Sequence, residues 1–256
     1  MPELPIRHPR GTLASALARG RAQRATPVNG SPRLVAIGGG GFTHGLDREL
    51  DEFVLDQSAG SQTRIGFLGA ASRDDPERIR RFHDRFDGVA ACALHLDAAA
   101  SAREVAAWTT GLDAVYVGGG DTGHLLDTWR ASGVDLVLLD AARRGLLLAG
   151  VSAGAAVWFE YALSDAGGRG LRPLGGLGLF AGSFCPHYST ERARRPEFER
   201  RVARGEMPEG LAIDDGAAVL VDASGPRLAR SARPGAWAYQ LCREGDRPVT
   251  ERLVAS

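Results

Sequence analysis

The sequence predicts an α/β fold with a mostly parallel sheet and helices on both of its faces. From residue 33 onward, short apolar or β-branched runs alternate with amphipathic segments, as expected for successive β-α units. Several runs, including residues 114–117 and 146–150, are apolar along their whole length. Strands of that kind are buried on both faces, which favours a parallel sheet covered by helices.

The first four strands are expected at residues 34–37, 64–69, 93–96 and 114–117. Helical spacing predicts a first helix over residues 46–57 and a second over residues 75–86. Asp74, Asp75 and Pro76 open the second helix, since Asp is a good N-cap and Pro suits the first turn. A helix after each later strand completes the alternation.

The fifth unit is predicted as a strand at residues 146–150 followed by a helix at residues 153–162. After Ser164 the pattern changes, because residues 167–178 are rich in glycine and look irregular. Beyond them we expect a strand at residues 179–185 and a charged helix at residues 190–204. The tail indicates antiparallel strands at the end of the sheet, at residues 216–222, 227–230 and 237–243.

The 256 residues show no internal repeat and no interdomain linker. We therefore expect one α/β domain over residues 32–256. Residues 1–31 carry several Arg and almost no acidic residues, yet they lack the continuous apolar segment of a secretory signal. A disordered leader is the expectation for residues 1–31.

Charge and cysteine usage exclude several functional classes. The 31 basic and 31 acidic residues cancel, so no charge bias points to nucleic acid or to a membrane surface as partner. The apolar runs are far shorter than the ~20 residues of a membrane span. Three cysteines without C-x-x-C spacing indicate neither a disulfide framework nor a zinc site, and they fit a reducing compartment, the cytoplasm.

Residues 150–154, Gly-Val-Ser-Ala-Gly, stand between a predicted strand and a predicted helix. A nucleophilic serine on such a turn has a strained backbone and needs small neighbours two residues away on either side. Ser152 is therefore a candidate nucleophile, and the amide of Ala153 would face the developing oxyanion at the helix N-terminus. The alternative is a tight turn in which Ser152 only caps the helix.

A second glycine turn, residues 118–122, ends the preceding strand. If sequential strands are adjacent, this loop lies beside Ser152 and its amides supply the other half of an oxyanion hole. A phosphate or dinucleotide cradle is the alternative. Neither this turn nor residues 38–41 has the G-x-G-x-x-G spacing, and no G-K-[ST] follows, so we expect no cofactor.

A serine nucleophile needs a base, and the chain has six histidines. His187 is favoured because it ends a predicted strand just before a helix, whereas His44 and His124 follow glycine turns and stay as alternatives. For the acid that orients the imidazole, Asp214 and Asp215 are candidates, and a role as triad acid is as well supported as a purely structural turn. The two acids before Gly216 would also make a hairpin turn.

Together these residues resemble the family of serine peptidases that contains peptidase E, an α-aspartyl dipeptidase, and the cyanophycinases. The matching segments, in the family's order, are residues 118–122, 150–155 and 186–188, within a resemblance that runs from about residue 33 to residue 221. The stretch after the histidine, residues 187–192, looks more like peptidase E than like cyanophycinase.

The resemblance implies a sheet related to class I glutamine amidotransferases, with Ser152 as nucleophile and His187 as base. It also implies Asp215 as the acid, with Asp214 close behind, because a Glu precedes glycine at this place in peptidase E. Gly119 or Gly120, together with Ala153, would bind the oxyanion. No metal or other cofactor is implied.

One departure from the family affects specificity. Peptidase E usually has Asn after its three glycines, and this chain has Asp121. The carboxylate stands where an acidic substrate side chain would be received, so Asp121 is a substrate-binding candidate and a strict preference for N-terminal Asp is not expected.

The expected function is hydrolysis of short peptides through an acyl-enzyme. An esterase or amidase of the same fold, or a small-molecule binding protein with a decayed site, are the alternatives. The sequence leaves open whether the chain forms a homodimer.

Overall fold

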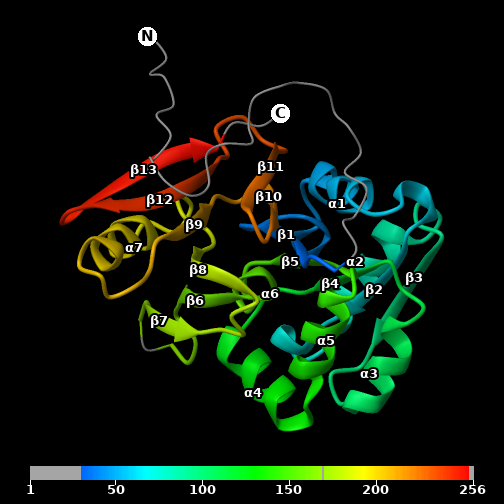
Figure 1. The fold of residues 1–256 in the computed structure, drawn as a ribbon. Helices are drawn as coiled ribbons and strands as arrows, with labels where there is room; N and C mark the ends of the chain where they lie inside the picture. Colours follow the sequence, from blue (N-terminus) through cyan, green and yellow to red (C-terminus); the bar gives the residue numbers. More distant parts are fainter. Residues whose placement is uncertain (1–29, 169, 254–256) are drawn as a thin grey trace.

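The computed structural model describes residues 30–168 and 170–253. The predicted leader at residues 1–31 lies outside these ranges except for Gly30 and Ser31, and the single domain stays a prediction. The described residues form two sheets and the helices around them (Figure 1). No helix in these ranges is both long and apolar enough to cross a membrane.

The larger sheet has seven strands in the order β11-β10-β1-β5-β4-β2-β3. Five of them are parallel: β1 (Arg33–Ile37), β2 (Arg64–Leu68), β3 (Cys92–Leu96), β4 (Ala114–Val117) and β5 (Leu147–Val151). Two C-terminal strands, β10 (Ala217–Asp222) and β11 (Gly225–Ser231), join one edge antiparallel. This arrangement confirms the predicted mostly parallel sheet, and it places the carboxyl ends of β4 and β5 side by side.

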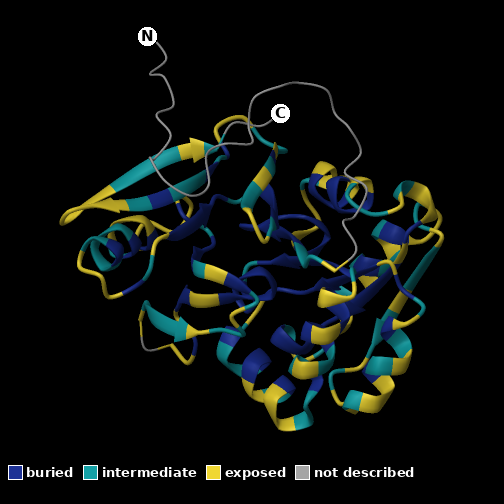
Figure 2. Cartoon of the chain, viewed as in Figure 1, coloured by how far each residue is buried: buried dark blue, intermediate teal, exposed yellow. Residues whose placement is uncertain are grey.

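Helices cover both faces of this sheet, as predicted. Val35 and Ile37 pack with α1 (Arg48–Asp56) and α2 (Pro76–Phe86), while Leu34 and Ala36 belong to the opposite core. That core contains α3 (Ala102–Thr109), α4 (Thr122–Ser132) and α5 (Val134–Arg143), which are grouped on one side in Figure 1. The central strands are accordingly dark along their length in Figure 2. Short 3-10 turns lie at Phe42–His44, Gly60–Gln62 and Ala70–Ser72.

The predicted helix at residues 153–162 is wrong beyond its first turn, because α6 (Ala153–Ala156) is short and β6 (Phe159–Ser164) follows. The sequence changes there from small residues to Val157, Trp158 and Phe159, which favour extended structure and are all buried. Phe159 stacks on Phe184 of the neighbouring strand, with ring centroids 5.0 Å apart. Packing of this segment against β8 therefore ends the helix after its alanine-rich first turn.

β6 belongs to a second, six-stranded sheet that the sequence did not predict, in the order β13-β12-β9-β8-β6-β7. Its other strands are β7 (Arg172–Gly175), β8 (Phe180–Cys185), β9 (Gly210–Ile213), β12 (Ala238–Glu244) and β13 (Arg247–Leu253), with α7 (Arg194–Ala203) packed against β12 and β13. Residues 167–178 thus contain a strand. The expected tail strands are divided between the two sheets, and three of the six strands, β6, β8 and β9, are parallel neighbours.

Candidate active site

Ser152 lies on the turn between β5 and α6 with φ 54° and ψ −114°. A non-glycine residue is strained in this conformation, as is typical of a nucleophile elbow. A β-carbon added at Gly150 would lie 2.1 Å from the Gly154 carbonyl oxygen, and one at Gly154 would lie 2.1 Å from the carbonyl oxygen of Val117. Both glycines are therefore required by the turn.

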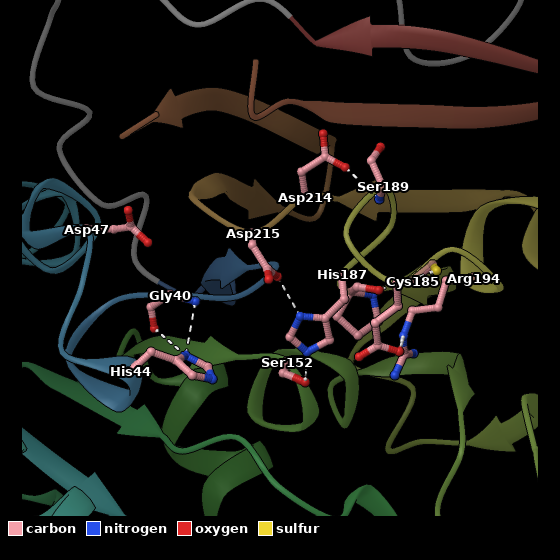
Figure 3. Close-up of polar contacts among 12 residues, drawn as sticks. Gly40, His44, Asp47, Ser152, Cys185, His187, Ser189, Arg194, Asp214 and Asp215 are labelled. Atoms are coloured by element: carbon pink, nitrogen blue, oxygen red, sulfur yellow. Dashed lines mark hydrogen bonds and ion pairs between the residues drawn. The ribbon is translucent and has the colours of Figure 1, made fainter. Parts of the chain in front are cut away.

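His187 and Asp215 line up behind this serine (Figure 3). The Nε2 atom of His187 is 2.8 Å from Ser152 Oγ, and its Nδ1 atom is 2.5 Å from Asp215 Oδ1. His187 follows β8 and has φ 54°, and Asp215 stands between β9 and β10. The three side chains form one continuous hydrogen-bonded series.

The ionisation of Asp215 sets the direction of these hydrogen bonds. Burial raises its pKa, but the hydrogen bond and charge of His187 and the nearby His44 outweigh burial and hold the pKa below its ordinary value. An ionised carboxylate only accepts hydrogen bonds, so Nδ1 of His187 carries a proton. In the neutral imidazole, Nε2 is then free to accept from the Ser152 hydroxyl.

Asp214, the other acid candidate, faces away from the imidazole (Figure 3). Its side chain is 3 % exposed and accepts hydrogen bonds from the amides of Ser189 and Trp237, at 2.9 and 3.0 Å. The Tyr239 hydroxyl lies 3.3 Å from the same carboxylate. Asp214 thus ties the segment after His187 to the start of β12, and Asp215 is the acid that contacts the imidazole.

The other histidines in the described ranges make no hydrogen bond to Ser152. The ring of His44 lies against the backbone of Gly40, with Nδ1 3.3 Å from the amide nitrogen and 3.2 Å from the carbonyl oxygen. His124 is in the first turn of α4. His83 and His95 are near Asp87 and Asp74. Of the three histidines considered as base, the structure places only His187 at the serine.

The loop after β4 lies against the nucleophile. A β-carbon at Gly119 would be 3.5 Å from Ser152 Cβ, and one at Gly120, whose φ is 142°, would be 2.1 Å from the Ala71 carbonyl oxygen. The loop is fixed at both ends, since the Gly118 amide donates to Leu68 and the Asp121 amide donates to Ala71. By contrast, the amides of Gly119, Gly120 and Ala153 donate to no described residue.

The Asp121 side chain is an N-cap, with Oδ1 accepting from the His124 amide at 3.0 Å. The structure gives the carboxylate a local role in starting α4. Its role in substrate binding stays a prediction. Within residues 30–168 and 170–253, no group of three or more His, Cys, Asp or Glu side chains is placed to hold a metal ion.

The structure adds the loop at residues 38–41, which sequence reasoning considered only as a nucleotide cradle. A β-carbon at Gly39 would lie 2.0 Å from Asp215 Oδ1 and 2.8 Å from His187 Nδ1. The loop therefore forms the back of the site. The signal was present as four glycines at the end of a strand, but glycine alone does not say which side chain takes the space it leaves.

The fold and the site together define an α/β protein with a serine, a histidine and a carboxylate in hydrogen-bonded series, the arrangement of serine hydrolases. Residues 34–228 match the family described as Peptidase family S51. The chain belongs to this family and is a serine peptidase, which confirms the resemblance found in the sequence.

Similar proteins agree with this assignment. The chain is 38 % identical over 211 residues to "Uncharacterized peptidase YgaJ" of Bacillus subtilis (strain 168), covering 82 % of this chain and 91 % of the relative. A crystal structure of a putative peptidase E protein from Listeria monocytogenes EGD-e has a TM-score of 0.57 at 18 % identity, covering 88 % of this chain and all of the other.

A peptidase from an acI-B1 Actinobacterium has a TM-score of 0.63 at 17 % identity, covering 89 % of this chain and 96 % of the other. At these identities, the two solved structures show the shared fold.

Proposed function

We propose that this serine peptidase hydrolyses short peptides, dipeptides among them, with Ser152 as nucleophile, His187 as general base and Asp215 as the acid that orients the imidazole. The observation that carries the proposal is the 2.8 Å contact between His187 Nε2 and Ser152 Oγ, with Asp215 on the other ring nitrogen. This is the relationship that activates a serine at neutral pH.

In the first half of the reaction, His187 Nε2 takes the proton of Ser152 Oγ as the oxygen bonds to the peptide carbonyl carbon. The carbonyl oxygen gains the negative charge, and the unbonded amides of Gly119 or Gly120 and of Ala153 are the proposed donors to it. His187 then gives its proton to the leaving nitrogen, the C–N bond breaks, and the acyl group stays on Ser152.

In the second half, water replaces the amine. His187 takes a proton from the water as its oxygen bonds to the acyl carbon, and then returns that proton to Ser152 Oγ as the ester bond breaks. Asp215 remains ionised throughout and stabilises the imidazolium that forms in each half. All the groups needed are side chains and amides of this chain.

Specificity is proposed to include Asp121, which directly follows the loop beside Ser152. Its negative charge would weaken binding of an N-terminal Asp. We therefore expect no strict preference for peptides that begin with Asp. The proposed partner is thus a short peptide rather than nucleic acid or a membrane. The cytoplasm is the proposed compartment, in keeping with the free Cys92, Cys185 and Cys242.

The test is hydrolysis of a dipeptide library that includes Asp-Leu, by the wild-type protein and by Ser152→Ala in parallel. The proposal expects turnover by the wild type and its loss in Ser152→Ala, together with labelling of Ser152 by a fluorophosphonate. Turnover that survives in Ser152→Ala contradicts the assignment of the nucleophile. Labelling and ester hydrolysis without any peptide turnover would instead indicate an esterase.

A further inference from the structure

Arg78 of α2 reaches the glycine loop beside Ser152, although 41 residues separate it from that loop. Its Nη1 atom donates to the Gly119 carbonyl oxygen at 2.5 Å, and the Arg78 side chain is 26 % exposed. Asp75, the N-cap of the same helix, lies 3.9 Å from the guanidinium Nε. A cation on a helix is therefore fixed to the peptide group that joins Gly119 to Gly120.

This contact determines where the amide of Gly120 points. The described chain has no cis peptide bond, so the carbonyl of Gly119 and the N–H of Gly120 point in opposite directions within one rigid peptide plane. When Arg78 holds the carbonyl on the α2 side, the N–H is held on the other side. That N–H makes no hydrogen bond to a described residue.

Besides Arg78, no described residue hydrogen-bonds to this peptide plane, although the loop is fixed on either side of it. Gly119 and Gly120 are both free of side chains, and Gly120 has φ 142°, a conformation that other residues rarely adopt. Neither glycine has a side chain that would oppose rotation of the plane between them. A rotated plane would turn the carbonyl oxygen to the side the N–H now faces, and its partial negative charge would repel an oxyanion.

We propose that Arg78 is a positioning residue for catalysis, which holds the Gly119–Gly120 peptide with its N–H directed at the developing oxyanion. The inference rests on the proposed function, in which this loop supplies a donor. The hydrogen bond is charge-assisted, so it also polarises the peptide and makes the Gly120 N–H a better donor.

Two other arginines of α2 make different contacts, and one of them, Arg80, provides a matched control. Arg81 donates to the Thr43 carbonyl at 3.0 Å, so it also joins α2 to a loop, but to a different one. Arg80 is bonded only to Glu77 and Asp84 on its own helix, among the described residues. Arg80→Ala therefore removes the same side chain from the same helix without touching the glycine loop.

The experiment compares the wild type, Arg78→Ala, Arg78→Lys and Arg80→Ala in dipeptide hydrolysis, with thermal unfolding as a check on folding. Removing a whole oxyanion donor costs about 10²–10³-fold in kcat. Because Arg78 acts through such a donor, we expect Arg78→Ala to lower kcat by about 10–100-fold with little change in KM. Arg78→Lys should retain part of the rate, and Arg80→Ala all of it.

Added guanidinium ion supplies a readout that a merely structural role would not move. It should restore part of the kcat of Arg78→Ala at concentrations that leave the wild type and Arg80→Ala unchanged. The inference is overturned if Arg78→Ala has the same kcat as the wild type, whether or not its KM rises. If Arg78→Ala does not fold, a folded Arg78→Lys variant with the full kcat of the wild type overturns the inference as well.

Fluorophosphonate labelling distinguishes a failure of the proposed function from a failure of the proposed role of Arg78. A wild-type protein that neither turns over peptides nor labels at Ser152 overturns the proposed function and this inference with it. A wild type that labels and turns over, beside an Arg78→Ala variant that does so equally fast, overturns the role of Arg78 alone.

Discussion

Gly39 and Asp215 pair in an isolated parallel bridge, and the space where Gly39 would carry a side chain is filled by the Asp215 carboxylate. The Gly216 amide also donates to the Gly39 carbonyl at 2.9 Å. The end of β1 therefore fixes the segment that presents Asp215 to His187. Close approach of backbone to carboxylate is possible only because residue 39 is glycine.

Replacing Gly39 with Ala should displace Asp215 from His187 while most of the core is retained. We expect kcat to fall by up to about 10⁴-fold, the cost of disabling the acid in a serine triad. The measurement is steady-state dipeptide hydrolysis with thermal unfolding beside it. Gly175→Ala is the matched control, because a β-carbon there meets nothing within 4 Å; equal activities in the two variants would contradict the prediction.

Replacing Asp214 or Asp215 with Asn should affect different properties, stability for Asp214 and catalysis for Asp215. Asp215→Asn should lower kcat by about 10⁴-fold with little loss of stability, because it alters the partner of His187. Asp214→Asn should cost about 3 kcal/mol of unfolding free energy, because its amide nitrogen cannot accept from a buried N–H. Urea unfolding and kcat of both variants check this, and a stability loss confined to Asp215→Asn would refute it.

Asp121→Asn should shift specificity toward N-terminal Asp. Two like charges about 4 Å apart repel by ~1 kcal/mol even in water, so kcat/KM for Asp-Leu relative to Ala-Leu should rise at least about fivefold. Asn is as good an N-cap as Asp, so α4 should keep its stability. An unchanged ratio of the two substrates would remove Asp121 from the proposed substrate site.

Asp51 should make stability depend on pH. Burial raises its pKa from the ordinary 3.8 to about 7, outweighing the attraction of Arg85. Between about pH 4 and pH 7 the folded protein therefore binds more protons than the unfolded chain, and this carboxyl makes stability fall as pH rises. The contribution is on the order of 4 kcal/mol, about three pH units at ~1.4 kcal/mol each.

The check is urea unfolding of the wild type and Asp51→Asn at pH 5 and pH 8. Asp51→Asn should gain stability relative to the wild type as pH rises, since Asn does not titrate. A free-energy difference between the two proteins that is the same at both pH values would show that Asp51 titrates normally.

The sequence predicted the parallel strands and the Ser152 turn because each depends on local pattern. Apolar runs such as residues 147–151 are typical of buried strands, and glycines at 150 and 154 suit a serine elbow. The second sheet was missed because β6 depends on contacts between Phe159 and distant strands. No local pattern separates such a segment from the end of a helix that starts with alanines.

The choice between Asp214 and Asp215 shows a similar limit. Neighbouring residues of an extended segment direct their side chains to opposite sides, so one acid had to face away from His187. Which one depends on the register of Asp215 with Gly39, a pairing between residues far apart in the chain. Composition and spacing contain no information about that register.

The proposed reacting groups come from different sheets. Ser152 follows β5 of the seven-stranded sheet, His187 follows β8 of the six-stranded sheet, and Asp215 is on the segment that crosses from β9 to β10. A chain emerging from the ribosome has no working nucleophile until both sheets have formed and docked. Under the proposed function, the measured rate per molecule therefore reports the fraction of fully folded chains, and a partly folded copy cleaves no peptide.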